Sequence, residues 1–425
     1  MMHGLVITPF DAAAILIVLA AILGYANHRF IHLPQSVGLT IMGAAASLIV
    51  VALDWLLPST KVGSDVTRFI ADIDFHATLM DGMLSFLLFA GALHVDWNEM
   101  RRGRWPIIVL STFGVLLSTA LVGGGFYVMA GLLGAPLPLA WCLVFGALIS
   151  PTDPVAIMRV LSRADIPATL QATVAGESLF NDGIGVVVFT IILAAALGDE
   201  PLSILNAAQL FLIEAGGGIM LGLAIGWIAF RAMQSIDDYN LEIMISLAVV
   251  MGGYTAARWL HVSGPVAMAV AGLLIGNHGV AHAMSDTTKD YLLKFWSLID
   301  DILNSVLFLL IGLEVVAISF DMRMLGLAIV AVPLALASRG ASVIVPLTLL
   351  KPFVTLGPLA PTTLVWGGLR GGISVALALG LPVGPYRASA LAATYLVVLF
   401  AVIAQGGTVE RVLKWKTRRI DAAKQ

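Results

Sequence analysis

The chain has 425 residues, of which 59% are hydrophobic and 12% are charged, with a formal net charge of −3 and a mean hydropathy of +0.98. A soluble domain of ordinary composition is roughly 25% charged, so this composition excludes a water-soluble globular protein and favours one that crosses a membrane several times. The Lys and Arg residues form no nucleic-acid patch, and the single Cys142 excludes an internal disulfide and a multi-cysteine metal site.

Thirteen apolar runs are predicted to cross a bilayer, a thickness that takes about 20 helical residues. The first run lacks the basic start of a secretory signal and is expected to stay as the first helix. The mixed-charge segments 61–76 and 285–300 are expected to be amphipathic and to lie at the membrane surface. The thirteen runs are 9–28, 35–57, 78–96, 105–133, 137–160, 168–197, 203–233, 239–257, 263–279, 302–319, 323–350, 360–382 and 386–410.

The basic end of the chain sets the expected orientation. An odd number of spans puts the two termini on opposite sides, and the sequence VLKWKTRRIDAAKQ (412–425) is expected in the cytoplasm with the N-terminus outside. Most Lys and Arg residues between the spans then fall in cytoplasmic loops, as the positive-inside rule requires. This pattern supports the predicted number of spans.

Two of the predicted spans are interrupted in their middle. The fifth contains ALISPTDPVAIM (147–158), where Pro151 and Pro154 each remove a backbone donor and clash with the preceding turn. The twelfth contains VWGGLRGGISVALAL (365–379), where four glycines surround Arg370 and weaken the helix. Non-helical backbone at membrane depth is tolerated where it lines a cavity or packs against protein.

The two interrupted spans are seven apart in the count, so they are expected to run in opposite directions. This predicts inverted repeats at about 9–197 and 239–410 around a linker helix at about 203–233, followed by a basic cytoplasmic tail at 411–425. The whole chain, 1–425, is expected to be one membrane transporter domain. Paired interrupted helices in two halves indicate a transport site, whereas a single kink is often a matter of packing alone.

Charged residues in the middle of a span are costly and are usually functional. Most other acids, Glu314 and Asp81 among them, are expected near span ends, although Glu214 lies well inside the seventh span. If each of two arginines neutralises one of three acids, one carboxylate is left over. The five mid-span charges are Asp153, Glu177, Asp182, Arg339 and Arg370.

Helix spacing suggests which carboxylate is spare. Glu177 and Asn181 share one face of a helix, and we expect them to meet Arg339 as a structural pair. Asp153 is expected to meet Arg370 where the broken helices cross, with capping of a helix end as the alternative role for Arg370. Asp182 then has no base, and Ser178 shares its face.

An oxygen-only site follows from these residues. A carboxylate from Asp182, hydroxyls from Ser178 and Thr152, and freed carbonyls suit a hard cation such as Na⁺ or Li⁺, by extension of the rule for hard cations. Burial of a carboxyl group also favours its protonated form. Cation and proton would therefore compete for one group, and alternating access to it would give exchange.

The motifs that carry these charges resemble a known family, the monovalent cation:proton antiporters of the NhaP and sodium/proton exchanger (NHE) type. The combination of GESxxND with GGLRG is specific for that family. The matching motifs, in the family's order, are SPTDPVA (150–156), GESLFNDG (176–183), FWSLIDDILNSVLFLLIGLE (295–314), SRG (338–340) and WGGLRGGISVALAL (366–379).

The resemblance implies an all-α fold of thirteen transmembrane helices, NhaA/NhaP-like, with crossed discontinuous helices 5 and 12 in a six-helix core. It also implies a dimerisation domain, a homodimer in a bacterial inner membrane, no cofactor, and transport by rocking of the core. Asp182 would bind Na⁺ or H⁺, with Thr152 and Ser178 as ligands and Asp153 as a supporting charge. The Asn181-Asp182 pair is typical of electroneutral members, so one cation is expected per proton.

Three alternatives stay open or are weighed against this reading. The substrate of the same fold is either Na⁺ or K⁺, and site size decides between them. A channel or uniporter would use the same charges along a continuous pore. An intramembrane enzyme is disfavoured because the sequence has neither a serine-nucleophile element nor an HExxH zinc motif.

Overall fold

A computed structural model of the chain describes residues 9–56, 78–154, 157, 158, 161, 166–198, 204–279, 284–314, 322–352, 354 and 356–422. The described residues form helices and short connections, with one isolated antiparallel bridge between Asp153 and Leu369. The surface segment predicted at 61–76 lies outside the described residues. The architecture is therefore all-helical, as the sequence predicts.

The first half of the chain runs through π-helical turns as well as α-helices. Its elements are α1 (Pro9–Ala26), η1 (Asn27–Ile31), α2 (Gln35–Leu56), η2 (Thr78–Met83), α5 (Leu84–Leu93), α6 (Trp97–Arg102), α7 (Arg104–Val109), η3 (Leu110–Gly114), α8 (Val115–Leu132), α9 (Leu139–Ile149) and α11 (Ala168–Leu197). The connection from α9 to α11 carries the first predicted interruption.

The second half carries the other interrupted span. Its elements are α12 (Ile204–Phe211), η4 (Leu212–Gly216), α13 (Gly217–Gln234), α14 (Tyr239–Trp259), α15 (Gly264–Leu274), η5 (Ile275–Gly279), α17 (Asp286–Leu313), α18 (Met322–Leu350), α19 (Ala360–Gly367), α20 (Gly372–Leu379), α21 (Arg387–Phe400), η7 (Ala401–Gly406) and α22 (Gly407–Ala422). The helices α19 and α20 together replace the twelfth predicted span.

Nine helices among the described residues are long and apolar enough to cross a membrane. Three shorter apolar helices, within α5, α9 and α15 with η5, add to them. Each of the thirteen predicted apolar runs overlaps a helix or, for the twelfth, the pair α19 and α20. Large apolar side chains such as Phe10, Leu205 and Trp259 are exposed on the outer helices, which is the surface expected where lipid takes the place of water.

One prediction differs from the structure at residues 285–300. Instead of a separate surface segment, these residues form the first half of α17, which continues without interruption to Leu313. Thr288, Leu292 and Trp296 follow one another at four-residue spacing and are buried, and the Trp296 indole donates a hydrogen bond of 2.9 Å to Ser246 of α14. The charged residues lie on the opposite face, so the segment is amphipathic but belongs to a long helix.

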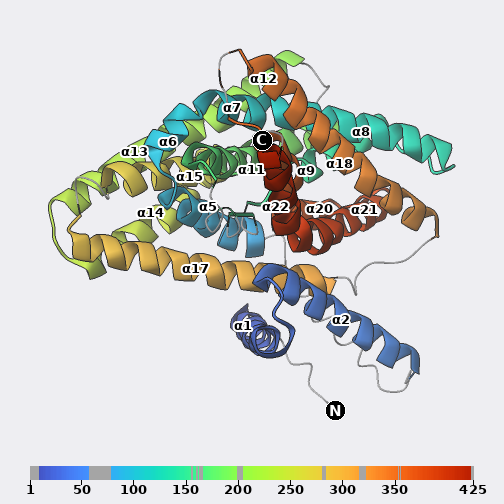
Figure 1. Cartoon of the computed structure of the whole chain (residues 1–425), viewed down its shortest axis with the longest axis horizontal. Coiled ribbons are helices and arrows are strands. Elements are labelled where there is room, and N and C mark those ends of the chain that lie inside the picture. The colour runs from blue at the N-terminus through green and yellow to red at the C-terminus, as the bar shows by residue number, and fades with distance from the viewer. Residues whose placement is uncertain are drawn as a thin grey trace.

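Figure 1 shows the helices in two groups, with α11 between them. We call α2, α5, α13, α14, α15 and α17 the scaffold helices, because each packs on another member of that set. We call α8, α9, α11, α18, α20 and α21 the core helices for the same reason. The long helix α17 runs along the scaffold and also contacts α20, so it borders both groups (Figure 1).

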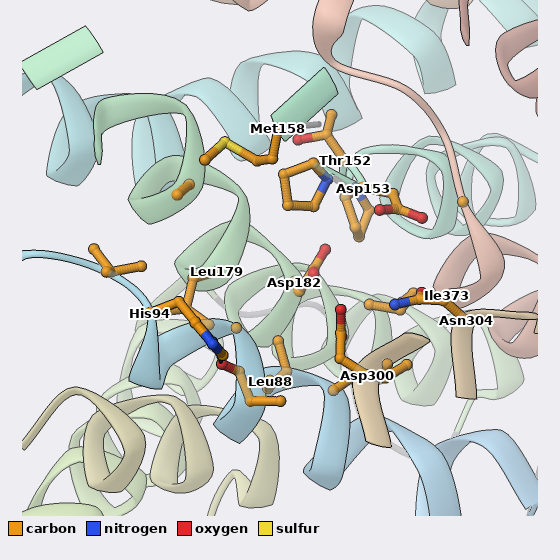
Figure 2. Close-up of a pocket in the computed structure, with 18 of the residues that line it drawn as sticks. Leu88, His94, Thr152, Asp153, Met158, Leu179, Asp182, Asp300, Asn304 and Ile373 are labelled. Atoms are coloured by element: carbon orange, nitrogen blue, oxygen red, sulfur yellow. Dashed lines mark hydrogen bonds between the residues drawn. The ribbon is translucent and has the colours of Figure 1, made fainter. Parts of the chain in front are cut away.

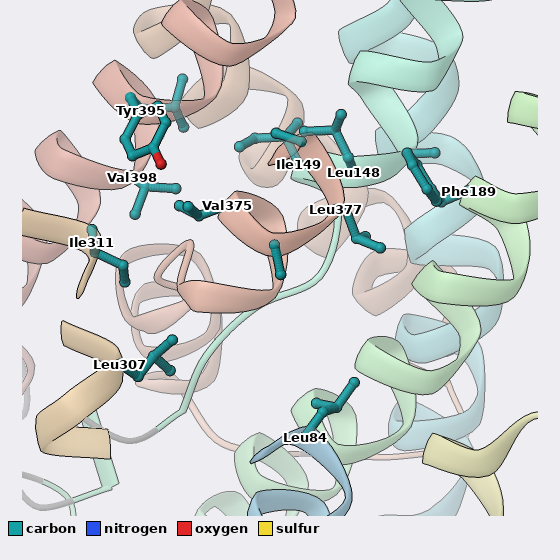
Figure 3. Packing of buried hydrophobic residues seen from close by; sticks show 14 of the residues in the cluster. Leu84, Leu148, Ile149, Phe189, Leu307, Ile311, Val375, Leu377, Tyr395 and Val398 are labelled. Carbon is teal, nitrogen blue, oxygen red and sulfur yellow. The ribbon is translucent and has the colours of Figure 1, made fainter. Parts of the chain in front are cut away.

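The short helix α20 is packed on several sides by apolar side chains (Figure 3). Val375 and Leu377 are buried among Ile149 of α9, Ile311 of α17 and Val398 of α21. The lone cysteine, Cys142, is buried in α9. A half-helix of eight residues has little stability alone, so this packing is what holds α20 in place.

Candidate functional site

The two interrupted spans meet through their non-helical residues. Helix α9 ends at Ile149, and the chain continues without helix through Pro154. Helix α19 ends at Gly367, and α20 begins at Gly372. The amide of Asp153 donates a hydrogen bond of 2.8 Å to the carbonyl of Leu369, so the freed backbone of one interruption is paired with that of the other.

Glycine is required at this crossing by close approach. A Cβ atom built on Gly371 would lie 2.5 Å from a carboxylate oxygen of Asp153 and 2.6 Å from its Cβ. Such contacts are far inside van der Waals distance, so any other residue at position 371 would push the two interruptions apart. The glycines around Arg370 therefore permit the crossing as well as the break.

Arg370 caps the end of α9. Its Nη1 donates to the carbonyl of Pro151 at 3.0 Å and also to the carbonyl of Ser150, while Nη2 has no hydrogen-bond partner among the described residues. A cation at a helix C-terminus is favoured by the helix dipole. These contacts match the capping role considered for Arg370, and its pairing with Asp153 stays a prediction.

Glu177 and Arg339 form a buried bidentate ion pair. The two Arg339–Glu177 nitrogen–oxygen distances are 2.9 and 3.0 Å, and both residues are buried. Arg339 also donates to the carbonyl of Leu364 at 2.9 and 3.1 Å. Because Leu364 lies on α19, this one guanidinium joins α11, α18 and the first half of the broken twelfth span.

Asn181 and Ser178 fasten α11 to the other interruption. The Asn181 amide nitrogen donates to Glu177 at 2.8 Å and to the Thr152 hydroxyl at 2.7 Å. Its oxygen accepts from the Thr152 amide at 3.2 Å, and the Ser178 hydroxyl donates to the Thr152 carbonyl. Glu177, Asn181 and Arg339 are therefore joined in one polar network, which holds the non-helical Thr152 against α11.

Asp182 is arranged differently from these neighbours. It is buried, yet no described residue donates a hydrogen bond to it or forms an ion pair with it. The negative charges of Asp153 and Glu177 lie close enough to repel charge on its carboxylate. Asp182 lines a cavity of about 680 Å³ together with Thr152 and Asp153, and Figure 2 shows how these three side chains lie.

The cavity is strongly acidic. Its described lining residues include His94 but no lysine or arginine. Like charges around one cavity focus the field and raise the local concentration of cations. The acidic residues that line it are Asp96, Glu99, Asp153, Asp182, Asp300 and Asp301.

Sequence reasoning missed part of this cavity. Asp300 and Asp301 were expected to be interfacial, and Asn304 and Ser374 were given no role, yet all four line the cavity beside Asp182. Three of them follow Ser297 at helical spacing on α17, a periodicity that the assignment of 285–300 to the surface concealed. Ser178 was predicted as an ion ligand, but it is not among the residues that line the cavity, and its hydroxyl donates a hydrogen bond to the Thr152 carbonyl.

Comparison with known proteins gives matches over most of the chain. A family model described as the transmembrane sodium/hydrogen exchanger matches residues 16–415. The chain is 46% identical over 402 residues to the Na(+)/H(+) antiporter NhaP of Pseudomonas aeruginosa, covering 93% of this chain and 94% of that protein. It is 31% identical to the Na(+)/H(+) antiporter NhaH of Halobacillus dabanensis, covering 87% and 90%.

A solved structure shares the fold. The sodium proton antiporter MjNhaP1 from Methanocaldococcus jannaschii, determined at pH 8, superposes with a TM-score of 0.70 at 20% sequence identity. The match covers 95% of this chain and 98% of the other. The arrangement of helices in this chain is therefore that of this solved structure.

Proposed function

This chain belongs to the sodium/hydrogen exchanger family, and from that premise we propose that it exchanges Na⁺ or Li⁺ for H⁺ across a membrane, with both ions competing for Asp182. It is an integral membrane transporter rather than an enzyme. The exchange is one cation for one proton, by alternating access. Transport needs no cofactor, since the cation and the proton are the substrates.

The observation that carries the proposal is the contrast within α11 between Asp182 and its neighbours. Glu177, Asn181 and Thr152 satisfy one another, whereas Asp182 meets a water-accessible cavity with no described partner. A buried carboxylate without a partner is unfavourable unless it is neutralised. A proton or a cation neutralises it, and both cannot do so at once.

The proposed ligands of the cation are oxygen atoms at the cavity wall and next to it, because Asp182 and Thr152 line the cavity and Ser178 contacts Thr152 without lining it. Asp182 supplies a carboxylate, Thr152 its hydroxyl, and Ser178 an oxygen whose hydrogen points to the Thr152 carbonyl. Asp153 adds a second negative charge at the cavity wall. These residues suit a hard monovalent cation, and a single uncompensated carboxylate supports the one-for-one stoichiometry.

We further propose that the protein is a homodimer in a bacterial inner membrane, with the N-terminus outside and the C-terminus in the cytoplasm. Basic residues support this orientation, because Arg411, Lys414, Arg418 and Arg419 are exposed on α22 beside Trp415. Lysine, arginine and tryptophan in this arrangement are typical of the cytoplasmic interface.

The test is exchange by purified protein in proteoliposomes with an imposed pH gradient, a pH-sensitive dye and a clamped membrane potential. Na⁺, Li⁺ and K⁺ are added in turn to the wild type and to Asp182→Asn. Cation-triggered loss of the gradient in the wild type alone supports the proposal and identifies the ion. Loss of the gradient in both proteins would show that Asp182 is not the exchanging group.

A further inference from the structure

The cavity beside Asp182 has a second polar wall that the network around Thr152 does not provide. Ser297, Asp300, Asp301, Asn304 and Leu307 all line the cavity from α17. Their spacing of three or four residues puts them on one stripe of the helix. At 1.5 Å per residue, Asn304 lies about 10 Å further along the helix than Ser297.

Exposure falls along this stripe. Ser297 and Asp301 are exposed, Asp300 is half-buried, and Asn304 is buried at 3% of its possible surface. The stripe therefore leads from the mouth of the cavity to its interior, and it is polar until Asn304. Figure 2 shows Asn304 beside the cavity that Asp182 enters from the opposite group of helices.

Two buried polar groups at the inner end have no partner. Within the described chain, neither the Asn304 side-chain nitrogen nor the Ser374 hydroxyl makes a hydrogen bond. Ser374 is buried at 1% and lines the same cavity from α20. Buried polar groups are almost always hydrogen-bonded, so two exceptions in one cavity require an explanation.

Packing brings these two groups to the same part of the cavity. A Cβ atom built on Gly372 would collide with the Leu307 side chain, so the start of α20 lies directly against α17. Ser374 is two residues into α20, and Asn304 is one helical turn before Leu307. A scaffold helix and a core helix thus each present an unpartnered polar group to the cavity that Asp182 also lines.

We propose that Asn304 and Ser374 supply further ligands to the bound cation, in addition to those around Thr152. The scaffold helices and the core helices then hold the ion together. The inference rests on the proposed exchange at Asp182. Ser374 contributes its hydroxyl oxygen. Asn304 contributes its amide oxygen, because a half-turn of the carboxamide places that oxygen where the nitrogen stands.

The proposal gives a bound cation a mechanical role. An ion ligated from α17 and α20 as well as α11 contacts both helical groups, so its binding favours the arrangement in which the two groups lie together around it. A cation that binds one arrangement of the groups better than the other shifts the equilibrium between them. Asn304 and Ser374 would therefore affect ion affinity and ion preference more than the maximal rate.

The test is the pair Asn304→Leu and Ser374→Ala, which remove the polar atoms and keep most of the volume. We expect the apparent KM for Na⁺ to rise about tenfold in each and the ratio of Na⁺ to Li⁺ affinity to change. The melting temperature without Na⁺ should be unchanged or higher, because an unpartnered buried polar group is removed. The rise in melting temperature on adding Na⁺ should be smaller than in the wild type.

Ser305→Ala is the matched control on α17. Ser305 donates to the Asp301 carbonyl and accepts from Gln35, each at 2.6 Å, so it faces α2 rather than the cavity. Its KM and its Na⁺-dependent melting shift should equal those of the wild type. If the leucine variant is not recovered, Asn304→Ala carries the same expectations.

The outcomes separate this inference from the function it rests on. An unchanged KM and melting shift in both variants, with wild-type exchange intact and Asp182→Asn inactive, would overturn the inference and leave the proposed function standing. A lower melting temperature with unchanged KM would make both residues structural. If the wild type exchanges no cation, the proposed function fails, and the Na⁺-dependent melting shift alone decides whether Asn304 and Ser374 hold an ion.

Discussion

Glu177 and Asp182 are buried carboxylates on one helix, α11, and lie little more than one turn apart. Their surroundings differ completely. Glu177 accepts two hydrogen bonds from Arg339 and one from Asn181. Asp182 meets a cavity lined with other acids. Burial alone therefore does not distinguish the two carboxylates, whereas their partners and their access to the cavity do.

The first test replaces the unpaired carboxylate, and Asp182→Asn should change transport more than any other variant. We expect cation-dependent proton flux to fall to background, because the amide cannot exchange a proton for a cation. Folding and insertion should be unaffected, since an unpaired buried charge is removed. Asp290→Asn, at an exposed pair with Lys294, is the control that should keep full activity. Retained Na⁺-driven flux in Asp182→Asn would contradict the assignment.

The second test acts on the paired carboxylate. Glu177→Ala and Arg339→Ala should each lower the free energy of unfolding by about 3–5 kcal/mol, because either change leaves an uncompensated buried charge. Chemical denaturation in detergent measures the loss. The double variant should lose less than the sum of the two single variants. Wild-type stability in both single variants would show that the pair is not structural.

The third test uses pH to change how strongly the proton competes with Na⁺ for Asp182. As pH falls, more Asp182 is protonated, and Na⁺ must displace a proton in order to bind. The apparent KM for Na⁺ should therefore rise with falling pH, approaching about tenfold per pH unit where the protonated form dominates. Initial rates at several Na⁺ concentrations and pH values measure this. A KM that does not change with pH would exclude competition at one group.

The smallest expected effect concerns the mouth of the cavity. Asp300→Asn removes one lining charge and should raise the KM for Na⁺ about twofold at low ionic strength through weaker attraction of cations. The difference should disappear when ionic strength is raised with a bulky organic cation, because salt screens the field. An effect that persists at high ionic strength would indicate direct contact with the ion.

Much of this fold follows from local sequence features. Runs of apolar residues located the helices, the prolines of SPTDP and the glycines of GGLRGG located the two interruptions, and four-residue spacing put Glu177 and Asn181 together. These features act within one helix or at one break, so they can be read from a single sequence.

Contacts between distant segments were harder to predict. That Arg370 caps α9 depends on how two interruptions cross, and the sequence favoured an ion pair with Asp153, with capping as the alternative. Asn304 belongs to a polar stripe on the side of α17 that faces the cavity. The composition of residues 285–300 resembles that of a surface segment, so this stripe was not recognised from the sequence. The division of 1–425 into two repeats and a linker stays a prediction.

The buried position of Cys142 makes the wild-type protein a ready background for thiol chemistry. Since the only native thiol is enclosed within α9, a cysteine introduced at exposed Ser297 would be the one group open to a membrane-impermeant maleimide. Labelling from one side of a vesicle would report which side the cavity faces. A change in the labelling rate on adding Na⁺ would follow the opening and closing of the cavity during transport.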